Sequence, residues 1–240
     1  MPTIRVDDIS VYYEIHGQGE PLLLINGLGA ELSEFRFLVE QLAKEHKVVA
    51  FDNRGSGQSD KPDIPYTIAM MAEDSACLLQ SLGVAKADVI GISLGGRIAL
   101  ELTLSHPELV HRLVLVSTSA RVNRTWLGYL VFDVIHRLPL LRGKQPRYAF
   151  NRQREASSSY DCTDRLSEVK AKTLILGGRK DRFSPIRLQE ELHVGIAASE
   201  MRTFDGGHLF FMMRERQNFL DAAVSWLRGP SRDAMESDGG

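Results

Sequence analysis

Short runs of consecutive apolar residues recur along the chain. Apolar runs of this length are typical of strands that are buried on both faces of a sheet. Two further segments near the start of the chain predict an antiparallel pair, and a shorter run near the end predicts a last strand. We therefore expect eight strands, at residues 3–6, 10–16, 22–25, 48–51, 89–92, 113–116, 174–176 and 201–204.

Between these runs, apolar residues recur three and four positions apart, which is the spacing of a helix with one buried face. The serine and proline at positions 184 and 185 favour a helix start, because serine can cap free amides and proline fits the first turn. Alternating strands and helices predict an α/β fold with a mostly parallel sheet flanked by helices. The expected helices span residues 34–45, 68–82, 94–105, 186–194 and 214–228.

This alternation stops from about residue 121 to residue 168, where apolar residues recur only at helical spacing. Insertions longer than an ordinary loop are commonly lids or binding elements. We therefore expect a short helical cap at 121–168, inserted into a core formed by 1–120 and 169–228. The polar tail at 229–240, with its glycine, proline and serine, is expected to be disordered.

The composition narrows the possible partners. The chain has 240 residues, enough for one large core, and its formal net charge is only −2, so no basic excess favours a nucleic acid partner. We expect no apolar run long enough to span a membrane and no signal peptide at the start. Cys77 and Cys162 are too few for a disulfide framework, so a cytoplasmic location is expected.

A Gly-x-Ser-x-Gly motif at 91–95 places Ser93 where a predicted strand ends and a predicted helix begins. A sharp turn between the two elements brings backbones too close together for side chains, which explains the glycines, and it exposes the serine hydroxyl. If each of its three fixed residues has an average frequency of about 7%, the motif arises by chance in roughly one chain in ten of this length. The motif therefore needs support from its surroundings.

Two later residues supply that support. Asp181 follows the strand expected at 174–176, and His208 follows the last expected strand. The order serine, acid, histidine resembles that of the α/β-hydrolase family, and the resemblance covers residues 3–228. It implies an α/β-hydrolase fold with a mostly parallel eight-stranded sheet and a short helical cap.

The same resemblance implies a catalytic triad. His208 would remove the proton from Ser93 as the hydroxyl attacks a carbonyl carbon, and Asp181 would orient the imidazole and stabilise its charged form. Asp205 could supply the acid from a different loop, so this alternative stays open. No cofactor is expected.

Negative charge on the carbonyl oxygen needs preorganised donors, for which backbone amides are the natural candidates. The amide of Leu94 directly follows the nucleophile, and the resemblance assigns the second oxyanion-hole amide to Leu28. Asn26 stands where many family members have histidine at the start of this loop. We expect Asn26 to change how the loop is anchored without removing the donor.

Other motifs predict structure rather than chemistry. The glycine-rich segment at 52–59 resembles a family turn, and it lacks the Gly-Lys-Ser/Thr ending of a phosphate-binding loop. The remaining histidines do not show metal-ligand spacing, so no metal site is expected. Seven arginines between residues 121 and 154 predict a solvated face, although one of them could meet an acidic substrate.

The apolar stripe within the expected cap could contact a substrate, and its candidate substrate-binding residues are Trp126, Leu130 and Val134; ordinary helix packing is the alternative. Together these features predict a serine hydrolase that cleaves a carboxylic ester of a small or medium apolar substrate. A C–C bond hydrolase, a lactonase, an amidase or a perhydrolase/haloperoxidase-like enzyme would use the same triad. A non-catalytic small-molecule-binding protein on this fold is the alternative from another class.

Overall fold

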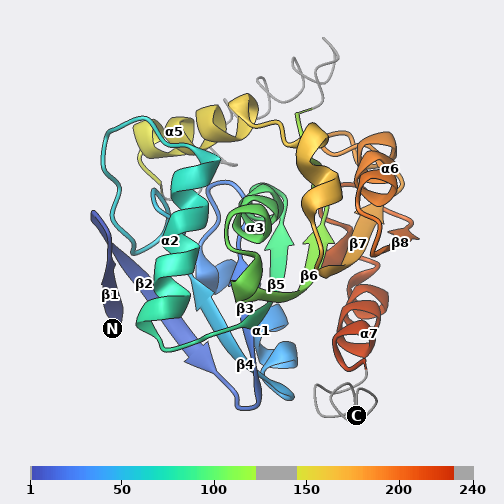
Figure 1. Cartoon of the computed structure of the whole chain (residues 1–240), viewed down its shortest axis with the longest axis horizontal. Helices are drawn as coiled ribbons and strands as arrows, with labels where there is room; N and C mark the ends of the chain where they lie inside the picture. Colours follow the sequence, from blue (N-terminus) through green and yellow to red (C-terminus); the bar gives the residue numbers. More distant parts are fainter. Residues whose placement is uncertain (1, 123–144, 230–240) are drawn as a thin grey trace.

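The computed structural model describes residues 2–122 and 145–229 and contains an eight-stranded sheet (Figure 1). The strand order is β1-β2-β4-β3-β5-β6-β7-β8, with β1 antiparallel to β2 and β2 antiparallel to β4. All other neighbours are parallel. The strands span Thr3–Val6, Ile9–His16, Glu20–Ile25, His46–Phe51, Ala87–Ile92, Val110–Val116, Lys172–Gly178 and Ser199–Phe204. The expected α/β fold with eight strands is thus confirmed.

Helices cover both faces of the sheet. On one face, α2 (Ile68–Ser81), α3 (Leu94–Ser105) and α6 (Ile186–Gly195) contribute to one apolar cluster. On the other face, α1 (Arg36–Leu42) and α7 (Arg216–Leu227) contribute to a second cluster. Strand β3 shows the division, because Leu23 and Ile25 belong to the first cluster while Leu22 and Leu24 belong to the second. Burial on both faces explains the continuous apolar runs.

The helix bounds differ from the expected ones by more than one residue at two places. The segment expected as one helix at 34–45 begins as the 3-10 turn η1 (Leu32–Phe35), and α1 then ends at Leu42. It stops early because His46 already pairs with Glu20 as the first residue of β4. Near the end of the chain, the 3-10 turn η5 (Phe210–Met212) precedes α7.

The expected cap insertion is described only in part. Helix α5 (Arg147–Ser159) and the 3-10 turn η4 (Thr163–Glu168) belong to it, and an isolated bridge joins Arg121 to Asp161. In Figure 1, α5 lies beyond the arrowheads of β5 and β6, which are the carboxyl ends of these strands. The candidate substrate-binding residues Trp126, Leu130 and Val134, and the tail after residue 229, lie outside the described residues.

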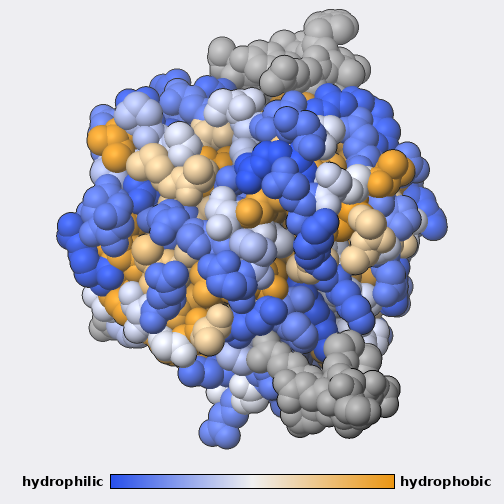
Figure 2. Space-filling model, viewed as in Figure 1, coloured by the Kyte–Doolittle hydropathy of each residue, from blue (hydrophilic) through white to orange (hydrophobic). Residues whose placement is uncertain are grey.

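The surface is mixed in character. On the face shown in Figure 2, apolar side chains gather in small groups between charged ones. Within the described ranges, no helix is both long enough and apolar enough to cross a membrane.

The parallel part of the sheet determines where chemistry can occur. The carboxyl ends of β3, β5, β7 and β8 lie at the same edge because these strands run in the same direction. In open α/β sheets, ligands bind in the crevice outside this edge. The loops that follow these four strands carry Leu28, Ser93, Asp181 and His208, so the fold gathers the four positions at one edge.

Candidate active site

Ser93 occupies a strained turn between β5 and α3. Its backbone has φ 55° and ψ −112°, in a region that residues other than glycine rarely adopt. The turn is tightly packed, since a Cβ atom on Gly91 would lie 2.5 Å from the Gly95 carbonyl oxygen, and one on Gly95 would lie 2.1 Å from the Ile25 carbonyl oxygen. The glycines of the motif are therefore required by close backbone approach.

His208 lies between Ser93 and Asp181. Its Nε2 is 2.9 Å from the Ser93 Oγ, and its Nδ1 is 2.8 Å from Asp181 Oδ2. The backbone carbonyl of His208 accepts a hydrogen bond from the Ser117 hydroxyl at 2.8 Å, and the ring of Phe183 packs edge-on against the imidazole. The structure thus brings the three predicted side chains into one hydrogen-bonded row.

The Asp181 carboxylate is fully buried, whereas 18% of the His208 side chain is exposed. The second oxygen of Asp181, Oδ1, accepts hydrogen bonds from the amides of Phe183 (2.8 Å) and Ser184 (3.0 Å). These amides hold the carboxylate in one orientation toward the imidazole. Buried carboxylates that lack such donors would be costly.

Asp205, the alternative acid, has a different partner. Its carboxylate lies 2.7 Å from the Lys180 ammonium and 61% of its side chain is exposed. The hydrogen bond and charge of Lys180 lower the pKa of Asp205 below its ordinary value. Asp181, not Asp205, is the carboxylate that contacts His208.

The loop after β3 passes beside the serine, because a Cβ atom on Gly27 would lie 3.6 Å from the Ser93 Cβ. Leu28 and Leu94 line the same cavity as Ser93 and His208. Leu94 is also the first residue of α3, where backbone amides point out of the helix and favour negative charge. Both predicted oxyanion-hole residues therefore lie next to the serine.

Asn26 anchors this loop to the neighbouring strand. The side chain is fully buried, and its Nδ2 donates to the Phe51 carbonyl oxygen at 3.1 Å. In return, Asn53 Nδ2 donates to the Asn26 carbonyl oxygen at 3.0 Å. The Asn26 side chain thus ties the start of this loop to the end of β4.

The turn at 52–59 is held by its own aspartate. Asp52 accepts hydrogen bonds from the amides of Leu32 at 2.7 Å and Gln58 at 2.8 Å, and burial raises its pKa above the ordinary value. Arg54 of the same turn is buried and forms an ion pair with Asp74 of α2. These contacts use the polar groups of the turn to stabilise the structure.

The described residues around the serine enclose a cavity of about 70 Å³. This volume suits the reacting group of a ligand and is small compared with pockets for a whole ligand. Sequence reasoning did not identify Arg97, Ser157 or Phe183 as part of the site. The lining residues are Leu28, Ser93, Leu94, Arg97, Val122, Ser157, Phe183, Ser184 and His208.

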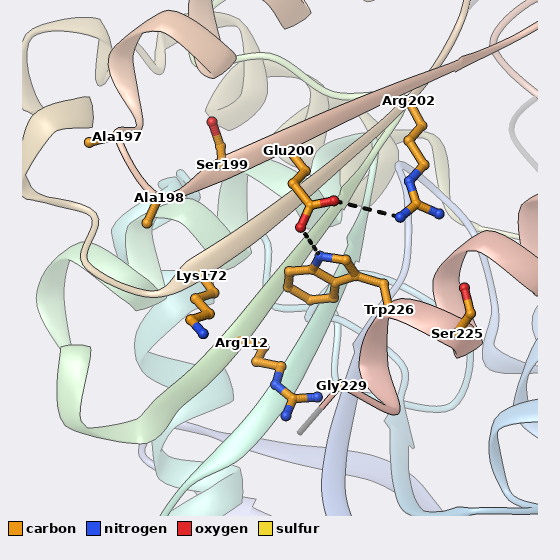
Figure 3. A pocket seen from close by; sticks show the side chains of 10 residues that line it. All are labelled: Arg112, Lys172, Ala197, Ala198, Ser199, Glu200, Arg202, Ser225, Trp226 and Gly229. Carbon is orange, nitrogen blue, oxygen red and sulfur yellow. Dashed lines mark hydrogen bonds and ion pairs between the residues drawn. The ribbon is translucent and has the colours of Figure 1, made fainter. Parts of the chain in front are cut away.

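A larger hollow of about 500 Å³ lies at the amino ends of β6, β7 and β8, the opposite edge of the sheet (Figure 3). Its central contact is a hydrogen bond of 3.0 Å from Trp226 Nε1 to Glu200, whose other oxygen lies 3.6 Å from Arg202. The hollow contains none of the predicted site residues. Its size therefore does not make it the candidate active site.

Potential metal ligands do not cluster in the parts of the chain that the structure describes. Histidine, cysteine, aspartate and glutamate side chains form no group of three or more there that could hold an ion. The histidine of the row is instead occupied by Ser93 and Asp181.

Comparisons with known proteins agree with this fold. Residues 20–158 match the family profile described as alpha/beta hydrolase fold. A relative from Azorhizobium caulinodans, named "Putative carbamate hydrolase RutD", is 31% identical over 88% of this chain and 92% of its own length.

Two solved structures resemble the whole chain. An esterase from Exiguobacterium antarcticum has a TM-score of 0.86 and 26% identity, over 95% of this chain and 99% of its own. An enol-lactonase from Burkholderia xenovorans has a TM-score of 0.84 and 25% identity, over 94% of this chain and 99% of its own. The chain therefore belongs to the α/β-hydrolase fold family.

Proposed function

We propose that the protein is a serine hydrolase that cleaves a carboxylic ester through an acyl-enzyme on Ser93. The observation that carries the proposal is the hydrogen-bonded row from Asp181 through His208 to Ser93, built on a strained turn at the carboxyl edge of the sheet. Backbone strain at a cavity is typical of functional residues. A buried serine that merely capped a helix would not need this conformation.

In the first half of the reaction, the Ser93 oxygen attacks the ester carbonyl carbon while His208 Nε2 takes the hydroxyl proton. The amides of Leu28 and Leu94 bind the resulting oxyanion, and the amino end of α3 adds favourable electrostatic potential. His208 then returns the proton to the departing alcohol, and Asp181 stabilises the imidazolium in between.

In the second half, water attacks the acyl-enzyme. His208 takes a proton from the water, and the collapse of the second tetrahedral intermediate releases the acid and restores the Ser93 hydroxyl. Loss of one oxyanion-hole donor typically lowers turnover about 10²-fold to 10³-fold. The arrangement thus uses one histidine as base and acid in turn.

Several bonds are open to the same side chains. The relatives' names include an esterase, an enol-lactonase and a carbamate hydrolase, and all three reactions proceed by attack on an acyl carbon. We propose the ester as the substrate class. Hydrolysis of a lactone, a carbamate or a C–C bond, and formation of a peracid, are the alternatives. The apolar stripe with Trp126, Leu130 and Val134 is proposed to contact the substrate, and this stripe is the basis for expecting an apolar acyl or alcohol group.

The test combines labelling with a substrate panel. Wild-type protein and Ser93→Ala are treated with a fluorophosphonate probe and assayed on p-nitrophenyl esters of graded length, lactones, carbamates and amides. We expect labelling at Ser93 and ester hydrolysis that Ser93→Ala abolishes while the circular dichroism spectrum is unchanged. Activity retained in Ser93→Ala would overturn the nucleophile assignment, and absence of both labelling and hydrolysis would favour a binding protein.

A further inference from the structure

Arg97 lies one helical turn after Ser93 and lines the same cavity. Residues four positions apart share a helix face, and long helical side chains lean toward the amino end of the helix. For Arg97 of α3, this direction is toward Ser93. The side chain is also withdrawn from solvent, since only 7% of the residue is exposed.

The hydrogen bonds of Arg97 end on neutral oxygens. Its Nε donates to the Ser119 carbonyl at 3.2 Å, and Nη2 donates to the Ser119 hydroxyl at 3.1 Å and the Arg121 carbonyl at 3.4 Å. Its Nη1 donates to the carbonyl of Ser157 at 3.3 Å and closely to the hydroxyl of Ser157. These bonds fix the guanidinium, but they do not neutralise its charge.

The nearby acidic groups of the described ranges are engaged elsewhere. Glu191 forms its ion pair with Arg121 at 2.7 Å, and Glu101 pairs with Arg165 at 3.1 Å. Asp181 is occupied by His208 and two amides. Within residues 2–122 and 145–229, Arg97 thus has no carboxylate in ion-pair contact.

A second buried arginine shows that this fold can neutralise such a charge. The guanidinium of Arg54 donates two hydrogen bonds of 2.6 Å to Asp74 and one of 3.0 Å to Asp8. These carboxylates raise the pKa of Arg54, whereas burial without such partners lowers the pKa of Arg97 to about 10. Arg97 therefore still carries its proton near neutral pH, next to the reacting serine.

A buried positive charge that no carboxylate of the described residues neutralises is unfavourable, and a negatively charged ligand group would compensate it. The Ser157 hydroxyl offers a route to a ligand, because its oxygen accepts from Arg97 and, among the described residues, its own proton makes no hydrogen bond to another group. Ser157 lines the cavity together with Arg97 and Ser93. The cavity thus combines a fixed positive charge with a hydroxyl donor.

We propose that Arg97 and Ser157 select esters whose acyl group carries a carboxylate. The Ser157 hydroxyl donates directly to this carboxylate, and the Arg97 guanidinium supplies the complementary charge behind it. The acyl group becomes bonded to Ser93 in the first half of the reaction and stays bonded until water releases it in the second, so it lies along the residues beside the serine. The inference rests on the proposed ester hydrolysis and names its substrate class.

The test compares two methyl esters of equal acyl length, monomethyl glutarate and methyl pentanoate, by pH-stat titration. Wild-type protein should prefer the anionic ester, and Arg97→Met should lower the ratio of the two kcat/KM values by about tenfold or more. Arg97→Lys keeps the charge and should retain part of the preference. Arg228→Met is the control, because Arg228 forms an ion pair with Glu45 and does not line the cavity, and it should leave the ratio unchanged.

A second measurement needs no variant. Phenylboronic acid and its para-carboxy derivative both add to a catalytic serine. The carboxylated probe should inhibit the wild type more strongly, and this difference in inhibition should shrink as the salt concentration is raised. Equal inhibition by the two boronic acids would overturn this inference, and so would a ratio of kcat/KM values in Arg97→Met that equals the wild-type ratio. If esters are still hydrolysed, the proposed function would stand. Inactivity toward both esters without fluorophosphonate labelling would overturn the proposed function and this inference together.

Discussion

The amide of Gly29 donates a hydrogen bond of 2.9 Å to Oε1 of Gln153, which lies 124 positions later in the sequence. The Gln153 side chain is fully buried, and its Nε2 donates to the Arg54 carbonyl at 2.7 Å and the Ser56 hydroxyl at 2.9 Å. Helix α5 is therefore linked to the loop that carries Leu28. A residue far from the serine in sequence holds one side of the proposed oxyanion hole.

Replacing Gln153 tests this link. Gln153→Met removes three hydrogen bonds and leaves the buried Gly29 amide without an acceptor, which costs about 1–3 kcal/mol of stability. Because the Leu28 amide would be less well positioned, we expect kcat on a p-nitrophenyl ester to fall about tenfold or more, with a smaller change in KM. Steady-state kinetics and thermal unfolding measure the two effects.

The control is Gln145→Met, since Gln145 is also buried but bonds to the Glu31 side chain rather than to the loop amide. This variant should keep the wild-type kcat. An equal fall in kcat for both variants would mean that any disturbance of buried glutamines affects the site, and the positioning role of Gln153 would be abandoned.

The assignment of the acid can be tested with two aspartates. Asp181→Asn removes the carboxylate that contacts His208 Nδ1 and should lower kcat by several orders of magnitude, on the order of 10⁴-fold. Asp205→Asn removes an exposed carboxylate paired with Lys180 and should leave kcat nearly unchanged. The reverse pattern in the same ester assay would show that the acid was misassigned.

Stability should depend on the buried ion pair between Arg54 and Asp74. The exposed fractions of the two side chains are 2% and 3%. Asp74→Asn therefore removes the negative charge beside a buried guanidinium and should lower the free energy of unfolding by about 3–5 kcal/mol. Asp8, which contacts the same guanidinium, has 44% of its side chain exposed. Asp8→Asn should therefore cost about 1 kcal/mol or less, and urea unfolding curves would reveal any inversion of this order.

The contact between Tyr12 and Glu14 should make stability depend on pH. The hydrogen bond from the Tyr12 hydroxyl, at 2.5 Å, lowers the pKa of Glu14 below its ordinary value of 4.5. A lowered carboxyl pKa gives stability that is fully present above the unfolded value and is lost as pH falls through the folded value.

Tyr12→Phe should therefore reduce the free energy of unfolding by about 1 kcal/mol near neutral pH, and the difference from wild type should shrink as the solution is acidified below about pH 4. Urea titrations of both proteins near neutral pH and below about pH 4 measure this difference in the free energy of unfolding. A gap between the two proteins that stays constant or widens in acid would contradict the linkage.

Much of the fold was predictable because its signals are local. The apolar run at residues 22–25 indicates a strand buried on both faces, and the structure confirms it with all four side chains fully buried. Ser93, Asp181 and His208 could be located because each lies within a few residues of the end of a predicted strand. Short loops after parallel strands must meet at one edge, so residue order along the chain was enough to bring them together.

The missed residues depend on contacts that have no local pattern. Arg97 looks like one charged position on an amphipathic helix, and its role depends on Ser119 and Ser157, which are 22 and 60 positions away. Gln153 looks like one of many polar residues of α5. Helix periodicity reports which face is buried, but it does not report which distant oxygen a buried polar group will reach.

The proposed site is divided among four strands, since Leu28 follows β3, Ser93 follows β5, Asp181 follows β7 and His208 follows β8. Partial assembly of the sheet would leave the serine without its base or its oxyanion donors, even where β5 and α3 had already formed. Recovery of the proposed esterase activity during refolding would therefore report the assembly of all four strands, and it should lag behind the recovery of helical signal. In this protein, the onset of turnover would report that the four strands carrying the site have assembled.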